Sequence, residues 1–317
     1  NFKLMAGYNQ ESSRKEQLKV ERLGMINEEY PSFSSATGER TIIDDYSEYA
    51  VRGAFYRLNY DYKGRYLFEA NGRYDGSSRF PKDSRFGFFP SFSLGWNVAK
   101  EDFMADYDTW LSELKLRVSW GQIGNQSISN YAFVPTMGAS LASWIYEGKR
   151  PTTLGTPALV SSSFTWETVE TTDIGINLSM LNNRLNLTAD WYIRDTKDML
   201  APGMELPSVL GASVPEQNVA DLRTKGWEIT LGWRDKIGDW GYNVGFNIYD
   251  SRTEITKFDN KNYLLGSPMD TDDSKHTNYV GRKIGELWGY VTDGFYTVDD
   301  FEDTHAWKLK EGVVSVQ

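Results

Sequence analysis

The chain has 317 residues, a formal net charge of −10 at neutral pH, two histidines and no cysteine. The acidic balance argues against nucleic acid as a partner, because phosphates attract surfaces rich in Lys and Arg. The lack of thiols excludes a disulfide scaffold, a cysteine–zinc site and a cysteine nucleophile, whereas 40% hydrophobic and 15% aromatic residues favour an ordered chain.

Period-2 alternation is the strongest pattern. It begins with a strand over residues 2–10 and a returning strand over about 50–60, and it recurs at 88–98, 114–121, 173–180, 185–194, 227–234 and 240–249. In the first of these recurring segments Phe92, Leu94 and Trp96 alternate with small or polar residues. Successive side chains of a strand point to opposite faces, so the pattern predicts two-faced strands, about ten in all.

The predicted strands are long. Each covers about 10 residues, whereas globular strands average about 5–6 and a tilted strand that crosses a bilayer needs about 9–11. No stretch approaches the roughly 20 apolar residues of a spanning helix. Aromatic residues near the segment ends resemble the girdles of an outer-membrane barrel; they are Tyr60, Tyr62, Tyr66, Trp96, Trp120, Trp166, Trp233 and Trp240.

The predicted connections alternate in length. Long loops are expected at 11–49, 122–165 and 195–224, tight turns at 61–65, 181–184 and 235–239, and intermediate connections at 75–86 and 99–112, the latter with a short helix. Outer-membrane barrels have long extracellular loops and short periplasmic turns, so residues 2–10 are expected to run outward. The alternative is a soluble sandwich or propeller whose apolar face packs on a second sheet.

Little in the sequence suggests catalysis. Neither nucleotide-binding glycine motif occurs, nor does the G-x-S-x-G elbow. His276 and His305 lie in polar segments, where a solvated loop histidine is the simpler interpretation. Acidic runs at 44–45, 270–273 and 299–303 match no complete calcium loop. We therefore predict no enzymatic activity, no metal and no cofactor.

Two groups of side chains are candidates for contact with a solute. Aromatic residues of the 122–165 loop are expected to stack on a sugar ring or an apolar solute: Tyr131, Phe133, Trp144 and Tyr146. For each of them, packing within the loop is the competing interpretation. Polar residues predicted to face a lumen, where they would contact a plug or passing solute, are Arg57, Glu69, Arg73, Lys115, Arg117, Asp173, Asp190, Arg194, Glu228 and Arg234.

Several motifs resemble one known family in their order and spacing. They lie at 55–60 with 73–80, at 88–96, at 114–126, at 182–200 and at 281–295. The second part of the first motif reads Arg-Tyr-Asp-Gly-Ser-Ser-Arg-Phe, and the third ends in Trp-Gly-Gln-Ile-Gly-Asn-Gln. Together they resemble the SusC/RagA family of TonB-linked outer-membrane transporters of Bacteroidetes, over residues 2–296.

The resemblance implies an all-β transmembrane antiparallel barrel of 22 strands, in the bacterial outer membrane, with residues 1–317 forming part of the barrel domain. The plug, the TonB box and the final strands would lie outside these residues. It further implies a SusD-like lipoprotein as partner, the TonB complex as energy source, and import of an oligosaccharide or peptide. The alternatives are a passive porin or an outer-membrane enzyme of the same build, and then a soluble carbohydrate-binding sandwich.

Overall fold

The computed structural model describes residues 1–27, 29–161, 164–202, 207, 209, 211, 214–258 and 279–286. The chain divides into two units, Asn1–Ile284 and Gly285–Gln317, and the strands among the described residues belong to the first. His276, His305, the acidic runs 270–273 and 299–303, and most of the 281–295 motif lie outside the described residues. No helix in the described part is long and apolar enough to cross a membrane, a finding that has no bearing on a β-barrel.

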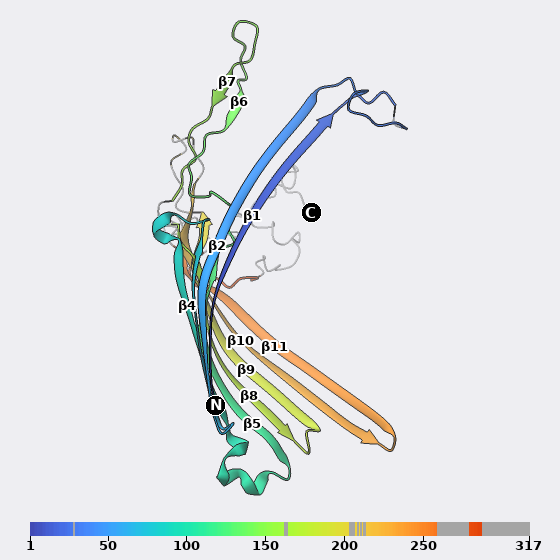
Figure 1. Cartoon of the computed structure of the whole chain (residues 1–317), viewed down its shortest axis with the longest axis vertical. Helices are drawn as coiled ribbons and strands as arrows, with labels where there is room; N and C mark the ends of the chain where they lie inside the picture. The colour runs from blue at the N-terminus through green and yellow to red at the C-terminus, as the bar shows by residue number, and fades with distance from the viewer. Residues whose placement is uncertain are drawn as a thin grey trace, which may run out of the picture. The chain divides into compact units, whose positions relative to one another are not determined.

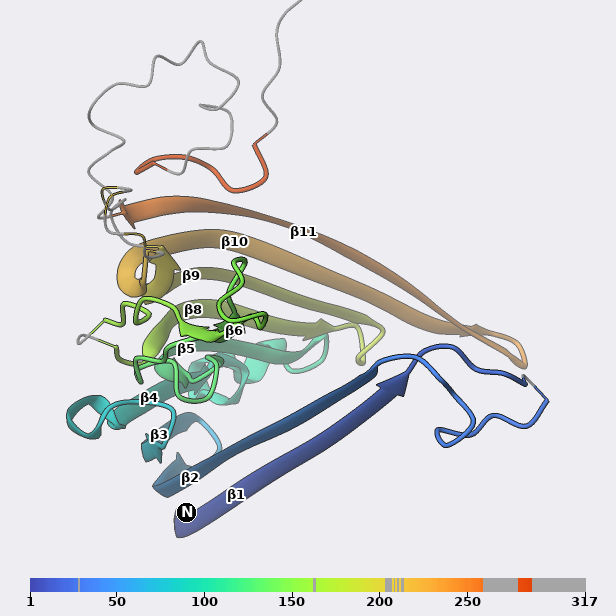
Figure 2. The same cartoon turned by 90° about the horizontal axis from the view of Figure 1, so that it is seen from above.

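Nine long strands form one antiparallel sheet, in which neighbours along the main chain are also neighbours in space (Figures 1 and 2). In sheet order they are β1 (Phe2–Arg22), β2 (Arg40–Tyr62), β3 (Tyr66–Ser77), β4 (Phe86–Asn97), β5 (Leu111–Asn125), β8 (Glu167–Met180), β9 (Leu185–Pro202), β10 (Glu216–Ile237) and β11 (Trp240–Phe258). Two short strands, β6 (Ala139–Leu141) and β7 (Thr152–Leu154), form a separate hairpin between β5 and β8.

The pairing register confirms the two-faced strands. Leu94 lies opposite Phe68 on one side and Val118 on the other, and Ile174 continues the row next to Val118. Residues directly opposite each other share a face, so the apolar positions join across the sheet. Leu116 is 40% exposed, Trp191 45% and Phe246 57%. Within the described residues, therefore, no second layer of protein covers this face as a sandwich would require.

Two predicted loops are mostly strand. β1 continues to Arg22 and β2 begins at Arg40, so the connection predicted at 11–49 shrinks to 23–39. Likewise, β9 extends to Pro202 and β10 begins at Glu216, inside the loop predicted at 195–224. These extensions are mostly polar, with scattered apolar residues such as Leu18, Val20 and Ile43, so they carry no regular alternation. Backbone pairing still holds them as strands, because the ladder runs without a break to Arg22 opposite Arg40.

The tight turns and the short helix are confirmed. β2 and β3 are joined by residues 63–65. Lys63 and Gly64 have φ angles of 53° and 66°, both positive as at the centre of a tight hairpin turn, and Arg65 donates its N–H to the Tyr62 carbonyl at 3.0 Å. The 99–112 connection contains two 3-10 helices, η2 (Val98–Lys100) and η3 (Asp102–Tyr107). A third, η1 (Lys82–Ser84), lies between β3 and β4.

Candidate functional site

All ten residues predicted to face a lumen share one face of the sheet. Arg57 lies opposite Asn71, Ser93 opposite Ser119, and Glu228 opposite Asp190. Residues directly opposite each other share a face. The other members keep the same parity on their strands. The structure therefore groups them on the side opposite the apolar face; that this side lines a lumen stays a prediction.

Charges on the β2–β3 part of the polar face are paired within the wall. Arg57 Nε donates to Asn71 Oδ1 at 2.7 Å and lies 3.9 Å from Glu69 Oε1. Asn71 in turn donates to Glu69 Oε1 at 2.8 Å. Arg73 donates two hydrogen bonds of 2.9 Å to Asp75, from Nε and Nη2. Such forked pairs hold both groups in place and leave little charge unbalanced.

The β5–β10 part shows the same arrangement. Arg117 Nη2 donates to Asp190 Oδ1 at 2.6 Å, and its Nε donates to Asn177 Oδ1 at 2.9 Å. The guanidinium of Arg194 lies over the Tyr192 ring at 5.8 Å. The sequence identified the charged residues but not the asparagines that bind them. Asn71 and Asn177 occupy the same alternate positions of their strands as the charged residues, and this could have indicated that they share the polar face.

The polar face is hollowed in two places. One hollow, of about 590 Å³, includes Lys115, Arg117 and Asp173 in its lining. The other, of about 730 Å³, is lined by Phe55, Phe89, Arg57, Arg73 and Asn71 among others. Both are bordered by Glu69, Ser93 and Ser119, so the two adjoin. A hollow lined by polar groups and bordered by aromatic side chains suits a polar solute that also has apolar faces.

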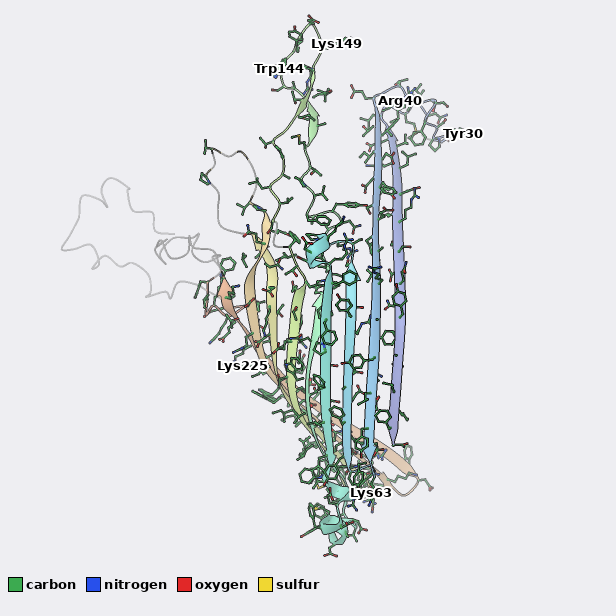
Figure 3. All side chains as sticks on the ribbon, turned by 60° about the vertical axis from the view of Figure 1, so that its left-hand side comes forward. Tyr30, Arg40, Lys63, Trp144, Lys149 and Lys225 are labelled. Carbon is green, nitrogen blue, oxygen red and sulfur yellow. The ribbon has the colours of Figure 1, made fainter. Side chains whose placement is uncertain are left out.

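The loop aromatics fall into two places. Tyr131 packs against β2, where its hydroxyl accepts a hydrogen bond from the Glu48 backbone N–H at 3.1 Å, and Phe133 is partly buried two residues further on. Trp144 and Tyr146 lie on the hairpin that projects beyond the sheet, with exposed fractions of 55% and 63% (Figure 3). Tyr131 is thus tied to β2 through its hydroxyl with its side chain 43% exposed, and the hairpin aromatics are more exposed. Contact of any of them with a solute stays a prediction.

The projecting hairpin is braced. Tyr146 and Lys149 exchange two backbone hydrogen bonds, of 2.8 and 3.0 Å, across Glu147 and Gly148. Both turn residues have positive φ, which matches the twist of a hairpin and which glycine adopts without strain. Arg150 Nε also donates to the Ala142 carbonyl at 2.6 Å. The aromatic tip is thus presented on a defined scaffold.

An aromatic cluster fastens the loops to the sheet. It comprises Phe80, Phe89, Phe164 and Trp166, with ring centroids 4.8 Å apart for Phe80 and Trp166. Trp166 Nε1 donates to the Arg85 carbonyl at 3.1 Å. The prediction of Trp166 as a girdle residue was wrong: it is 6% exposed, because the loop folds back and buries it.

Arg79 reinforces this attachment. Its guanidinium lies 4.2 Å from the centre of the Tyr49 ring on β2. Its Nε donates to Asn130 Oδ1 at 2.9 Å and its Nη1 to the Gln126 carbonyl at 3.0 Å. The motif at 73–80 therefore joins β2, β3 and the connection after β5, a role that sequence reasoning missed.

A second charged cluster lies at the short-turn end. Arg65 pairs with Glu101 at 3.4 Å and forms a hydrogen bond with Asp102. Hydrogen bonds from Trp96 and Tyr66, together with the Arg65 charge, lower the pKa of Glu101. The hydrogen bond from Arg65 lowers the pKa of Asp102. In the described residues, no group of three or more metal-binding side chains is arranged to hold a metal ion.

Comparisons with known proteins agree with this architecture. A family model described as "TonB dependent receptor-like, beta-barrel" matches residues 3–308. Over 267 residues the chain is 31% identical to the TonB-dependent receptor SusC of Bacteroides thetaiotaomicron, covering 80% of this chain and 26% of SusC. Over 275 residues it is 33% identical to the TonB-dependent receptor P26 of Formosa agariphila, covering 85% of this chain and 26% of that protein.

A solved structure agrees with the family assignment. The structure of the RagAB peptide transporter superposes with a TM-score of 0.70 and 25% identity, covering 81% of this chain and 28% of that one. The chain thus spans about a quarter of the length of the curated relatives it matches. An open sheet of nine strands is consistent with a sequence that provides only part of a barrel wall.

Proposed function

Because the chain belongs to the TonB-dependent receptor-like β-barrel family, we propose that it forms part of the wall of an active importer of a large nutrient, either an oligosaccharide or a peptide. Members of this family are β-barrel proteins of the outer membrane, and the segment belongs to that membrane. They are transporters rather than enzymes, in line with the lack of catalytic motifs.

The uncovered apolar face carries the proposal. Leu94 is 59% exposed, Val244 61% and Phe246 57%, and they belong to rows that run across the sheet. In water, each such side chain would forgo about 1.5–3 kcal/mol of burial free energy, and a patch of this extent would aggregate. Lipid as the solvent for this face removes that cost. The polar face then meets water or a plug inside the barrel.

The partners follow from the relatives rather than from contacts in this chain. A SusD-like lipoprotein would cover the loop end, where the aromatic cluster and the projecting hairpin lie. The TonB complex would act on a plug in the portion of the relatives' length that this chain does not span. The similarity to SusC and to the RagAB transporter supports both partners.

The test is energy-dependent uptake by cells that produce the whole protein. Fluorescently labelled oligosaccharides and peptides are supplied with TonB present and with TonB deleted. The proposal predicts that one of the two classes accumulates, and only with TonB. Uptake that persists without TonB would instead establish the passive porin.

A further inference from the structure

A third hollow, of about 330 Å³, lies on the apolar side of the sheet, and we call it the outer hollow. Trp191 on β9 lies opposite Trp227 on β10, which in turn lies opposite Asp250 on β11. Residues directly opposite each other share a face, and Trp227 has the same parity on β10 as Leu231, the partner of Phe246. The charged side chains in its lining are Arg223, Lys225, Asp250, Arg252, Glu254 and Lys283. Charged groups thus gather on the side of the sheet that we assign to lipid.

The apolar face becomes charged at the level of the two tryptophans. Toward the loop end of β11, the positions on this face are, in order, Val244, Phe246, Ile248, Asp250, Arg252 and Glu254. The change occurs at the same level on β10, since Lys225 lies opposite Arg252 and Arg223 lies opposite Glu254. Tryptophan is enriched where hydrocarbon meets the headgroups of a membrane. Charges that follow it along the strands therefore lie among the headgroups.

The length of the apolar stretch agrees with this position. Trp240, beside the short turn, and Asp250 are ten residues apart on β11. At about 3.3 Å per residue and a tilt of about 35–45°, they differ in height by about 23–27 Å. The apolar band of an outer-membrane barrel is about 25 Å tall. The outer hollow therefore lies where that band ends, on the side of the loops.

The arginines of the outer hollow have acidic partners. Arg223 donates to both carboxylate oxygens of Asp195, at 2.6 Å from Nε and 2.9 Å from Nη2. Arg252 Nε lies 3.7 Å from Asp250 Oδ2, and the Arg252 side chain is 75% exposed. The first pair is a tight fork, whereas the second is loose. The carboxylates of both pairs are thus opposed by a positive charge of their own.

The two lysines of the outer hollow leave it with an excess of positive charge. Lys225 extends from β10 (Figure 3), and Lys283 is brought to β11 by a backbone bridge at Glu254. Within the part of the chain that the structure describes, neither lysine takes part in an ion pair, and both are exposed. With Asp195 counted, four cationic side chains face three acidic ones. The hollow therefore favours an anion.

We propose that the outer hollow binds the phosphate-bearing headgroup of a lipid in the outer leaflet of the membrane. Lys225 and Lys283 supply unpaired ammonium groups with three N–H donors each, and phosphate oxygens accept charge-assisted hydrogen bonds from such groups. Trp191 and Trp227 lie on the membrane side of these lysines, at the level where acyl chains begin. The site depends, as the proposed function does, on lipid at the apolar face, but it assigns a ligand to the outside of the wall.

Photocrosslinking of the whole receptor tests the site. Lipid A, a phosphorylated and acylated glucosamine disaccharide, is given a diazirine in one acyl chain and titrated onto the receptor in neutral maltoside micelles. Crosslinks to β10 and β11 are quantified by peptide mass spectrometry. A lysine near an anionic membrane surface contributes about fivefold to binding. Lys225→Ala combined with Lys283→Ala should therefore raise the concentration for half-maximal crosslinking about 25-fold. The control, Lys149→Ala with Lys236→Ala, removes two exposed lysines outside the hollow and should leave that concentration unchanged.

Two further probes separate the phosphate from the lipid. Photoreactive lipid A without its phosphates, a probe that needs no substitution in the receptor, should require a concentration at least about 25-fold higher. Inorganic phosphate at the same concentration as lipid A should not displace it, because it lacks acyl chains. Lys225→Arg with Lys283→Arg should keep the binding tight, since guanidinium groups also donate to phosphate. A heat-modifiable band on gels shows that each variant is assembled.

Three results would overturn the site. They are equal half-maximal concentrations for the alanine variant and the unsubstituted receptor, equal crosslinking of lipid A with and without its phosphates, and displacement by an equal concentration of inorganic phosphate. The second would mean contact through acyl chains alone, and the third would assign the hollow to a free anion. Any of them together with normal TonB-dependent uptake would leave the proposed function standing. Uptake that persists without TonB, with the binding of lipid A intact, would remove the active importer and keep the site.

Discussion

The aromatic cluster at the loop end gives the sharpest prediction, tested by Phe80→Ala. The Phe80 side chain is fully buried, and its ring packs against that of Trp166. Truncation of a buried Phe to Ala typically costs about 3–5 kcal/mol. Because about 1.4 kcal/mol corresponds to a tenfold change in an equilibrium constant, the population of the undocked loop should rise by about a hundredfold or more.

Chymotrypsin treatment of intact cells measures that population. When the loop closes faster than it is cut, the cleavage rate follows the fraction of open molecules. Cleavage after Phe164, identified by mass spectrometry, should therefore accelerate about a hundredfold in Phe80→Ala. A heat-modifiable band on gels checks that the barrel itself still assembles.

Trp144→Ala is the matched control, since this aromatic residue is 55% exposed and lies on the projecting hairpin. It should leave cleavage after Phe164 unchanged. An unchanged rate in Phe80→Ala, or an equal acceleration in both variants, would refute the idea that the cluster holds the loop on the sheet.

Three further predictions concern the apolar face, the hairpin and the short-turn end. Leu94→Arg places a charge on the apolar face, at a cost of about 2–4 kcal/mol near the bilayer midplane, and should reduce the amount of assembled receptor in membranes. Ser93→Arg, on the opposite face, should not reduce it. Equal amounts of the two variants would contradict the assignment of the faces. Replacing Trp144 and Tyr146 together with Ala should weaken solute capture by whole cells with normal assembly, and unchanged uptake would remove them from the site. The carboxylates of Glu101 and Asp102, which bind Arg65, have lowered pKa values, so the stability that they contribute is present above the usual carboxyl range and is lost as the pH falls through those lowered values. Arg65→Ala should therefore weaken the dependence of the melting temperature on pH at acidic pH. An unchanged dependence in this variant would argue against the pairing.

The faces of the sheet were predictable from sequence because a strand repeats every two residues. Leu94 and Ser93 were assigned to opposite sides on that ground, and the register confirms it. The short turns were predictable too, since Lys63-Gly64 interrupts the alternation with a residue that tolerates positive φ. In both cases the signal is local.

The attachments at the loop end were not predictable in this way. Trp166 binds the backbone of Arg85, and Tyr131 that of Glu48, in each case some 80 residues earlier in the chain. No periodicity records such a contact, because it depends on how two loops meet after the sheet has formed. The mostly polar extension of β1 to Arg22 was not predicted for a related reason. Backbone pairing holds it as a strand, and side-chain alternation plays no part.

The proposed function depends on lipid at one face of the sheet and water or a plug at the other. Nitroxide side chains placed singly at Phe92, Ser93, Leu94, Ser119 and Phe246 of the whole receptor in bilayers test it through collisions with oxygen and with a water-soluble nickel chelate. Oxygen collisions are expected to dominate at Phe92, Leu94 and Phe246, and the serine positions are expected not to share this preference. Low collision rates with both reagents at the three apolar positions would show protein packed against that face and would rule out its contact with lipid.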